Sequence, residues 1–313
     1  MLKNQDRGRV FGKSLNRLED PSLLRGVCGF IDDIPVDQPL HAVFVRSPLA
    51  HALVKGINKN EAGDQDGVFG IYTLADILPH CVNGKMPPAP GSPLVADVPD
   101  QFVLANDEVC HVGEPIAVVL ARTRHLAEDA AALVQVDYEP LPVANDCRAA
   151  CEIHAPVFRS SHQNNIAADF KLSYGDPSSA FANAPHVLRR ELHQYKGLGH
   201  SLECRGVLAK YEPFECRTKI WSSTQAPHSA LRKIIEFTGW HEKEVKLIAP
   251  AVGGGFGPKY IFYPEEAVIP LLARTIKRPI KWVEDRTEYF TAAIQERDQY
   301  WNMEIATDDI GTI

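Results

Sequence analysis

Alternation of apolar and polar residues predicts a series of strands in the first half of the chain. Residues 41–46 alternate, and residues 68–73 form a second apolar run of strand length. Residues 115–121 are apolar at nearly every position, which is typical of a strand buried on both faces. An Ala-rich helical segment, residues 123–133, comes next, and residues 134–138 alternate again. Strand, helix and strand with short links predict a compact α/β unit.

The second half repeats this mixture of elements. Strands are predicted at residues 186–193, 207–211 and 218–221, and a helix begins near Pro227 and ends at Gly239. Three further elements follow along the chain: a strand at residues 245–249, a helix that opens at residues 264–266 and a strand at residues 280–283. The whole pattern predicts a mixed α/β (α+β) fold.

The last predicted element is a hairpin with one arm. Residues 300–306 alternate as a strand, residues 307–311 form a turn, and residues 312–313 would begin the return strand. A strand without its return arm has unpaired backbone groups along one edge. We therefore expect the sequence to be cut off at its C-terminal end.

Segments without periodicity divide the chain. Residues 1–20 are a polar arm, and residues 146–170 are predicted to link a first domain, residues 21–145, to a second, residues 171–313. Residues 81–100 are rich in proline and predict a long irregular loop, which is either functional or a surface excursion.

Composition narrows the class of protein. The chain is 45% hydrophobic and 23% charged, which is ordinary for a globular protein, and its net charge of -7 argues against nucleic acid or an anionic membrane as partner. No apolar run has the length of a membrane-spanning helix, and the N-terminus lacks the apolar core of a signal peptide. Seven scattered cysteines favour reduced thiols in a cytoplasm.

The glycine-rich run at residues 252–259, Val-Gly-Gly-Gly-Phe-Gly-Pro-Lys, is the strongest candidate for a ligand-binding loop. Glycines allow the main chain to approach a ligand closely, and Phe256 is the only large apolar side chain among them. A phosphate-binding P-loop requires Ser or Thr after Gly-Lys, and a dinucleotide fingerprint requires glycine where Pro258 stands. Both nucleotide interpretations are weak, and a purely structural turn stays open.

The sequence gives less support to a zinc site or a nucleophile formed by cysteines. Cys147, Cys151 and His154 lack the second cluster of ligands that a zinc site needs. Cys204 lies beside charged residues and could be a nucleophile, but no His and Asn partners are identifiable. A buried apolar role is the simpler interpretation of Cys204.

A second loop, Ser223-Thr224-Gln225, ends one predicted strand and precedes the helix at Pro227. Its simplest role is to cap that helix, while Gln225 offers both an amide donor and a carbonyl acceptor. Two strand-to-helix loops can meet at the same ends of adjacent strands, where binding crevices form.

These motifs, taken in order, resemble the molybdenum-binding large subunit of the xanthine dehydrogenase/aldehyde oxidase family, which includes aerobic carbon monoxide dehydrogenases. The resemblance covers nearly the whole chain. Its motifs are Arg17-Leu18-Glu19-Asp20-Pro21, Arg46-Ser47-Pro48-Leu49-Ala50-His51-Ala52, Gly113-Glu114-Pro115, Asp137-Tyr138-Glu139-Pro140, Glu203-Cys204-Arg205-Gly206, Ser223-Thr224-Gln225, the glycine-rich run and Trp282-Val283-Glu284-Asp285-Arg286.

The resemblance implies an a/b hammerhead domain followed by the first part of a molybdopterin-binding domain. It also implies a molybdenum–molybdopterin cofactor, in the cytosine dinucleotide form for a bacterial member, with 2Fe-2S clusters and FAD on partner subunits. In the family, metal-bound hydroxide attacks an aldehyde or N-heteroaromatic substrate and hydride passes to the molybdenum centre.

Carried over by position, the resemblance gives Gln225 an amide hydrogen bond to a metal oxo ligand. Gly254, Gly255, Phe256 and Gly257 would place main-chain N–H groups and an aromatic edge against the cofactor and substrate. Tyr260 stands where the xanthine-oxidising branch has a purine-contacting Glu, which argues against purine specificity. The family's general-base Glu lies beyond this chain, so no catalytic residue and no metal-ligating side chain is assigned.

Two hypotheses for function follow. In the first, the chain is part of an enzyme that acts on a small molecule and is completed by iron–sulfur and FAD subunits and by a further molybdopterin-domain segment. In the second, it is a non-catalytic remnant or assembly module that keeps the fold without cofactor. In either case we expect the isolated chain to bind no stoichiometric molybdenum.

Overall fold

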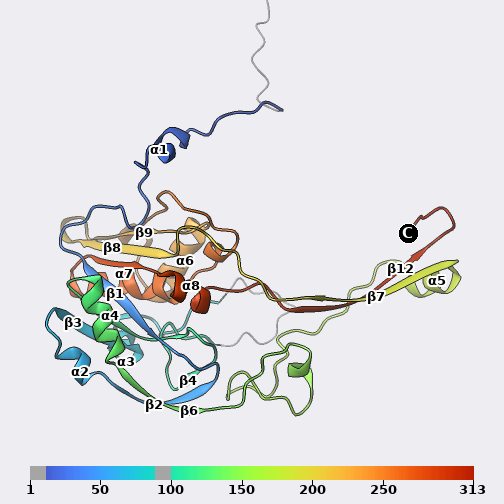
Figure 1. Cartoon of the computed structure of the whole chain (residues 1–313), viewed down its shortest axis with the longest axis horizontal. Coiled ribbons are helices and arrows are strands. Elements are labelled where there is room, and N and C mark those ends of the chain that lie inside the picture. The colour runs from blue at the N-terminus through green and yellow to red at the C-terminus, as the bar shows by residue number, and fades with distance from the viewer. Residues whose placement is uncertain (1–11, 89–99) are drawn as a thin grey trace, which may run out of the picture.

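A seven-stranded sheet organises the protein (Figure 1). The computed structural model describes residues 12–88 and 100–313, so the expectations for residues 1–11 of the arm and 89–99 of the proline-rich loop fall outside the described residues. In spatial order the strands are β10 (Val245–Ile248), β9 (Arg217–Ser222), β8 (Gly206–Glu212), β11 (Ile280–Val283), β1 (Leu40–Arg46), β5 (Pro115–Ala121) and β3 (Val68–Thr73). Every residue of β5 is buried, as the apolar run predicts.

This sheet contains strands from both predicted domains. β1 pairs in parallel with β11, with Leu40 opposite Ile280, and pairs antiparallel with β5 on its other side. The segments before and after residues 146–170 therefore share one sheet and one core. The domain division at residues 146–170 stays a prediction.

Helices cover both faces of the sheet. Alternate residues of β1 explain this arrangement: Ala42 and Phe44 pack in the cluster that includes α6 (Pro227–Thr238) and α7 (Pro264–Ile276), and Val43 and Val45 pack toward α4 (Arg124–Ala132). The ring of Phe44 meets that of Trp282 edge-on at 5.7 Å, which ties β1 to β11 within the core. The mixed α/β class is confirmed.

A second, three-stranded sheet consists of β4 (Glu108–Val109), β2 (Ala52–Asn58) and β6 (Gln135–Pro140). The strands on either side of α4 thus belong to different sheets, because β6 pairs with β2 and not with β5. The predicted strand–helix–strand unit bridges two sheets. Other short helices of the described chain are α1 (Asp20–Leu24), α2 (Asn60–Gly63), α3 (Leu74–Ile77) and α8 (Arg286–Ala292).

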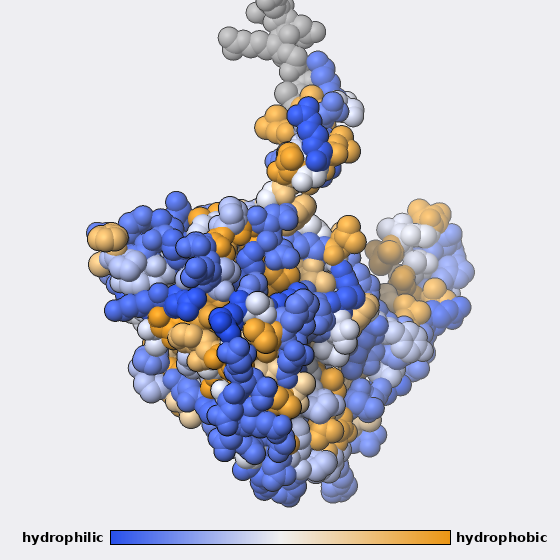
Figure 2. Space-filling view, turned by 60° about the vertical axis from the view of Figure 1, so that its left-hand side comes forward, coloured by the Kyte–Doolittle hydropathy of each residue, from blue (hydrophilic) through white to orange (hydrophobic). Residues whose placement is uncertain are grey.

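A two-stranded ribbon extends away from the body toward the right of Figure 1. It pairs β7 (His186–Gln194) with β12 (Gln299–Thr307), and α5 (Pro177–Asn183) lies near its tip. Beyond β12 the N–H of Asp308 donates to the carbonyl of Thr312 at 3.0 Å, so the predicted turn is present but no strand begins at Thr312. The segment around α1 also projects from the body, as Figure 2 shows from another side. Leu18, just before α1, is exposed.

The predicted linker, residues 146–170, is fastened to the first segment by Glu108. The N–H and hydroxyl of Ser160 donate to Oε1 of Glu108 at 2.9 and 2.7 Å, and Nε2 of His51 lies 2.8 Å from the same oxygen. The irregular stretch is therefore held in place by buried polar contacts. Within the described ranges, the helices are all too short or too polar to cross a membrane.

Candidate cofactor-binding site

Two loops converge at one edge of the large sheet, as the sequence predicts. β9 and β10 are parallel neighbours with Trp221 opposite Ile248, so the chain leaves both strands at the same edge. Residues 223–225, the Gln225 loop, follow β9, and residues 252–259, the glycine loop, follow β10. The N–H of Gly257 donates to Oε1 of Gln225 at 3.1 Å, and the N–H of Gln225 donates to the carbonyl of Lys259 at 2.9 Å.

The contact with Gly257 fixes the chemical orientation of the Gln225 amide. Only the carbonyl oxygen of an amide accepts a hydrogen bond, so Oε1 occupies the inner position and Nε2 keeps its two donors. Within the described part of the chain, no acceptor lies within hydrogen-bonding distance of Nε2, and the residue is exposed. Gln225 therefore presents a donor pair to an incoming ligand.

The glycine loop approaches Gln225 more closely than a side chain would permit. A Cβ on Gly255 would lie 2.3 Å from Cδ of Gln225. Gly257 has φ +101°, and Phe256 has φ 51° with its side chain 68% exposed. Among the residues that the structure describes, none accepts from the backbone N–H groups of Gly254, Gly255 and Phe256. The loops thus present an open group of N–H donors that suits an oxygen-rich or anionic ligand.

The connection to the next helix differs from that of a nucleotide-binding loop. After Gly257 the chain makes a short 3₁₀ turn at Pro258–Tyr260, and α7 begins only at Pro264. In P-loops and dinucleotide folds the glycines lead directly into a helix N-terminus, which contributes its N–H groups to the phosphate. This geometry agrees with the sequence argument against both nucleotide motifs.

An acid–base pair of a buried lysine and a partly exposed glutamate lies behind the two loops. Oε2 of Glu203 accepts from Nζ of Lys259, the N–H of Gly253 and the hydroxyl of Ser223, each at 2.8 Å. The Lys259 side chain is fully buried, and burial lowers the pKa of its ammonium although Glu203 opposes that shift. In the sequence, Glu203 stands out only as part of the Glu203-Cys204-Arg205-Gly206 motif, and no local pattern predicts its role. Its position in an acidic–basic motif just before β8 is the available signal.

A network of charges underlies the site and joins the two segments. Arg205 pairs with Glu284 and Glu265, and Arg46, from β1, pairs with Glu265 and Glu288. Burial acts to lower the pKa of Arg205, but the two carboxylates outweigh it and the net shift is upward. Arg205 therefore stays charged, and the ion pairs of Arg46 hold β1 against the start of α7.

Another buried carboxyl, that of Glu266, has a raised pKa. Burial raises the pKa of Glu266 to about 7, against the hydrogen bonds from the hydroxyl of Ser222 and the N–H of Tyr263. It sits in the first turn of α7 and lines a void of about 10 Å³ together with Trp282, whose buried Nε1 has no partner within the described residues. Near neutral pH this carboxyl holds a proton for much of the time.

Cys204 and Cys147, two candidates from the sequence, do not have the environment of a nucleophile or a metal ligand. Burial raises the pKa of the Cys204 thiol, which is the opposite of what an activated nucleophile needs. Cys147 donates from Sγ to the carbonyl of Asp298 at 3.5 Å. Across residues 12–88 and 100–313, no group of three or more His, Cys, Asp or Glu side chains is placed to hold a metal ion.

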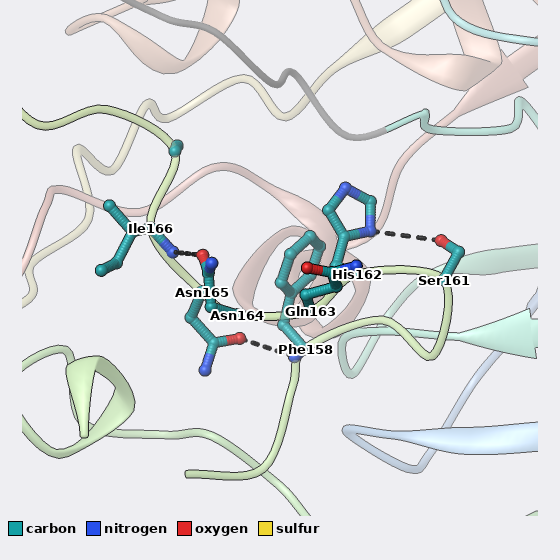
Figure 3. Close-up of a pocket in the computed structure, with 8 residues that line it drawn as sticks. Phe158, Ser161, His162, Gln163, Asn164, Asn165 and Ile166 are labelled. Carbon is teal, nitrogen blue, oxygen red and sulfur yellow. Dashed lines mark hydrogen bonds between the residues drawn. The ribbon is translucent and has the colours of Figure 1, made fainter. Parts of the chain in front are cut away.

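A polar cavity of about 290 Å³ lies in the linker, well separated in sequence from both loops. Figure 3 shows the side chains that line it. It is lined by a single stretch, residues 158–167, in which Oδ1 of Asn165 accepts from the N–H of Phe158 at 2.8 Å. It shares no lining residue with the Gln225 loop or the glycine loop. A larger cavity of about 700 Å³ lies between the two segments, with Arg46 and Gly113 on one side and Ile261 and Phe290 on the other.

Comparison with known proteins identifies the class. The model of the "aldehyde oxidase and xanthine dehydrogenase, a/b hammerhead domain" matches residues 25–142, and that of the "molybdopterin cofactor-binding domain" matches residues 158–313. The chain belongs to the xanthine dehydrogenase/aldehyde oxidase family, with a hammerhead segment followed by a molybdopterin-binding segment.

Individual relatives agree with this class. The chain is 38% identical over 304 residues to the nicotine 6-hydroxylase large subunit of Paenarthrobacter nicotinovorans, covering 97% of this chain and 37% of the relative. It is 33% identical over 319 residues to the carbon monoxide dehydrogenase large chain of Afipia carboxidovorans, covering 96% and 38%. The crystal structure of quinoline 2-oxidoreductase from Pseudomonas putida 86 superposes with a TM-score of 0.85 at 32% identity, covering 95% and 37%. The chain thus spans little more than a third of the length of these relatives.

Proposed function

We propose that this chain supplies one side of the molybdenum–pterin site of a molybdenum-dependent hydroxylase or dehydrogenase. The observation that carries the proposal is the contact between Gly257 and Gln225, which leaves the Nε2 donors of Gln225 free beside the open N–H groups of the glycine loop. When bound, the cofactor would supply two-electron oxidation of a small molecule. In this proposal Gln225, Gly254, Gly255, Phe256 and Gly257 contact the cofactor.

In this proposal the residues of the chain would bind and orient the cofactor. Nε2 of Gln225 and the N–H groups of Gly254 and Gly255 donate to electronegative atoms of the cofactor, in positions fixed before binding. The exposed ring of Phe256 offers a flat apolar surface at the same place. No side chain of this chain is assigned as a general base.

Two of the relatives favour an N-heteroaromatic compound as the substrate in this proposal. Nicotine and quinoline, which appear in the names of two of them, both contain a pyridine-type ring. Phe256 and Tyr260 are exposed by 68% and 65%, and aromatic surfaces of this kind stack on flat rings. Tyr260 in place of an acidic residue would leave the purine-specific contact unmade.

The proposed setting is a multi-subunit assembly. Iron–sulfur and FAD subunits would carry electrons away, and a further molybdopterin-domain segment would complete the cofactor site, which is open on this chain. We also propose the cytosine dinucleotide form of the pterin and, from the odd and scattered cysteines, a cytoplasmic location. The domain division at residues 146–170 belongs to the same proposal.

Affinity purification of the tagged chain with its natural partners tests the function. We expect the complex to contain molybdenum and an oxidisable pterin in near-equal amounts, measured by elemental mass spectrometry and pterin fluorescence, and we expect Gln225→Ala to lower the retained molybdenum or its turnover. A complex that holds iron–sulfur and flavin subunits but no molybdenum would instead support the assembly-module hypothesis.

A further inference from the structure

We propose that the ion pair between Glu203 and Lys259 positions the Gln225 loop and the glycine loop in their ligand-binding arrangement before any ligand is present. We treat both as positioning residues, since the side chain of Lys259 is fully buried and both residues make hydrogen bonds with the two loops. The nature of the ligand rests on the proposed function, but the arrangement of the loops does not.

Glu203 connects the two loops through one oxygen. Its Oε2 accepts from the N–H of Gly253, at the start of the glycine loop, and from the hydroxyl of Ser223, at the start of the Gln225 loop, both at 2.8 Å. The N–H of Glu203 also donates to the carbonyl of Gly253 at 3.2 Å. One residue thus sets the spacing of both loops where they leave β9 and β10.

Lys259 connects the same loops at their other ends. Its Nζ donates to Oε2 of Glu203 at 2.8 Å, and its carbonyl accepts from the N–H of Gln225 at 2.9 Å and from the hydroxyl of Thr224 at 3.2 Å. The side chain is fully buried, so its position is determined by packing as well as by charge. A change at Nζ is therefore transmitted to the main chain that holds Gln225.

Charge attraction alone does not explain why an ion pair, rather than an apolar pair, joins Glu203 and Lys259. Removing charged groups from water is unfavourable, and an apolar pair of the same shape is often as stable as a buried ion pair. Burial lowers the pKa of Lys259, which indicates that the charged form is held at a cost. The compensating feature is geometric, because one charged oxygen, Oε2 of Glu203, accepts three hydrogen bonds at once, and a neutral group of the same size would accept fewer.

Hydrogen–deuterium exchange of the full chain in its assembly, read by mass spectrometry, tests the proposal. Lys259→Met keeps the buried stem and removes the charge, and Glu203→Gln keeps the shape and removes the charge. We expect exchange in peptides covering residues 223–226 and 253–260 to become faster by about tenfold or more, as the loss of one or two hydrogen bonds implies. Glu215→Gln, in an exposed pair with Lys219, is the matched control and should leave both peptides unchanged.

The same measurement separates positioning from bulk stability. A purely structural pair would speed exchange throughout, including the buried strand β5, without a local excess at the two loops, and that result overturns the proposal. If Lys259→Met does not fold, Glu203→Gln carries the test by the same criterion. The readout needs no cofactor, so absence of molybdenum from the assembly contradicts the proposed function only, and unchanged loop exchange contradicts this inference only.

Discussion

The backbone N–H of Gly257 donates a hydrogen bond to Oε1 of Gln225 at 3.1 Å, and this contact joins two loops that are 32 residues apart in sequence. It occupies the acceptor end of the amide and leaves the donor end exposed. The amide of this exposed, flexible side chain is thereby held with its oxygen toward Gly257 and its nitrogen outward. This relationship makes Gln225 the residue whose substitution is most informative.

Substitution of Gln225 should affect function far more than folding. Gln225→Ala removes the donor pair, and in the complete assembly we expect turnover to fall by about 100-fold, as for loss of a preorganised donor in other enzymes. The residue is exposed, so the melting temperature should change by only a few degrees. Steady-state kinetics and thermal unfolding measure the two effects, and unchanged kinetics would rule out its place beside the cofactor.

Gln225→Glu refines that test. A carboxylate still accepts from the N–H of Gly257 but has no donor at the outer position. We expect the loops to keep their arrangement while turnover falls as in Gln225→Ala. A variant that retains wild-type turnover would show that the amide donors are not used.

Gly255 should not tolerate a side chain. A Cβ there would lie 2.3 Å from Cδ of Gln225, so Gly255→Ala must displace the amide or the loop. We expect a loss of roughly 1–3 kcal/mol in the free energy of unfolding and a fall in turnover. Gly29→Ala, whose Cβ would meet nothing within 4 Å, is the control for urea denaturation. Equal behaviour of the two variants would contradict the close approach.

The ion pairs of Arg46 should stabilise the join between the segments. Arg46→Met leaves the nearly buried carboxylates of Glu265 and Glu288 without this partner, and breaking a buried pair costs about 3–5 kcal/mol. Lys55→Met, which removes an exposed pair with Glu139, should cost less than about 1 kcal/mol. Chemical denaturation at neutral pH compares the two, and a small effect for Arg46→Met would mean that the packing of β1 suffices.

Glu266 should make stability depend on pH. Its folded pKa of about 7 lies above the ordinary value of 4.5 for a glutamic acid, so its stabilising contribution is complete below about 4.5 and is lost as pH rises through 7. Relative to Glu266→Gln, wild-type protein should lose up to about 3 kcal/mol of unfolding free energy between pH 4.5 and 8. Urea titrations of both proteins at several pH values measure this, and a constant difference would place the folded pKa near its ordinary value.

Local pattern was sufficient for the elements and for the loops. Apolar spacing and the glycine at position 239 predict α6, which runs from Pro227 to Thr238 and ends with Gly239 in the left-handed conformation. The uniformly apolar run at residues 115–121 predicts a strand buried on both faces, and β5 is that strand. These features depend on residues within one or two turns or strands of each other. Sequence alone therefore determines them.

The same local pattern was misleading about how elements combine. The strand–helix–strand segment around α4 predicts one compact unit, but β5 and β6 lie in different sheets. In the large sheet β1 pairs with β11 across 240 residues of chain (Leu40 with Ile280), a pairing that no local pattern indicates. Pairing partners and register depend on contacts between distant segments, which no local period records.

The candidate site shows both what the sequence determines and what it leaves to the tertiary structure. The sequence by itself determined that two polar loops follow two strands, and the resemblance singled out Gln225 and the residues of the glycine loop. Only the tertiary structure decided that β9 and β10 are parallel neighbours, that Gly257 takes the acceptor of Gln225, and that Glu203 and Lys259 meet behind the loops. The physical reason is that a hydrogen bond or ion pair between distant residues exists only after burial and strand register have brought them within about 3 Å.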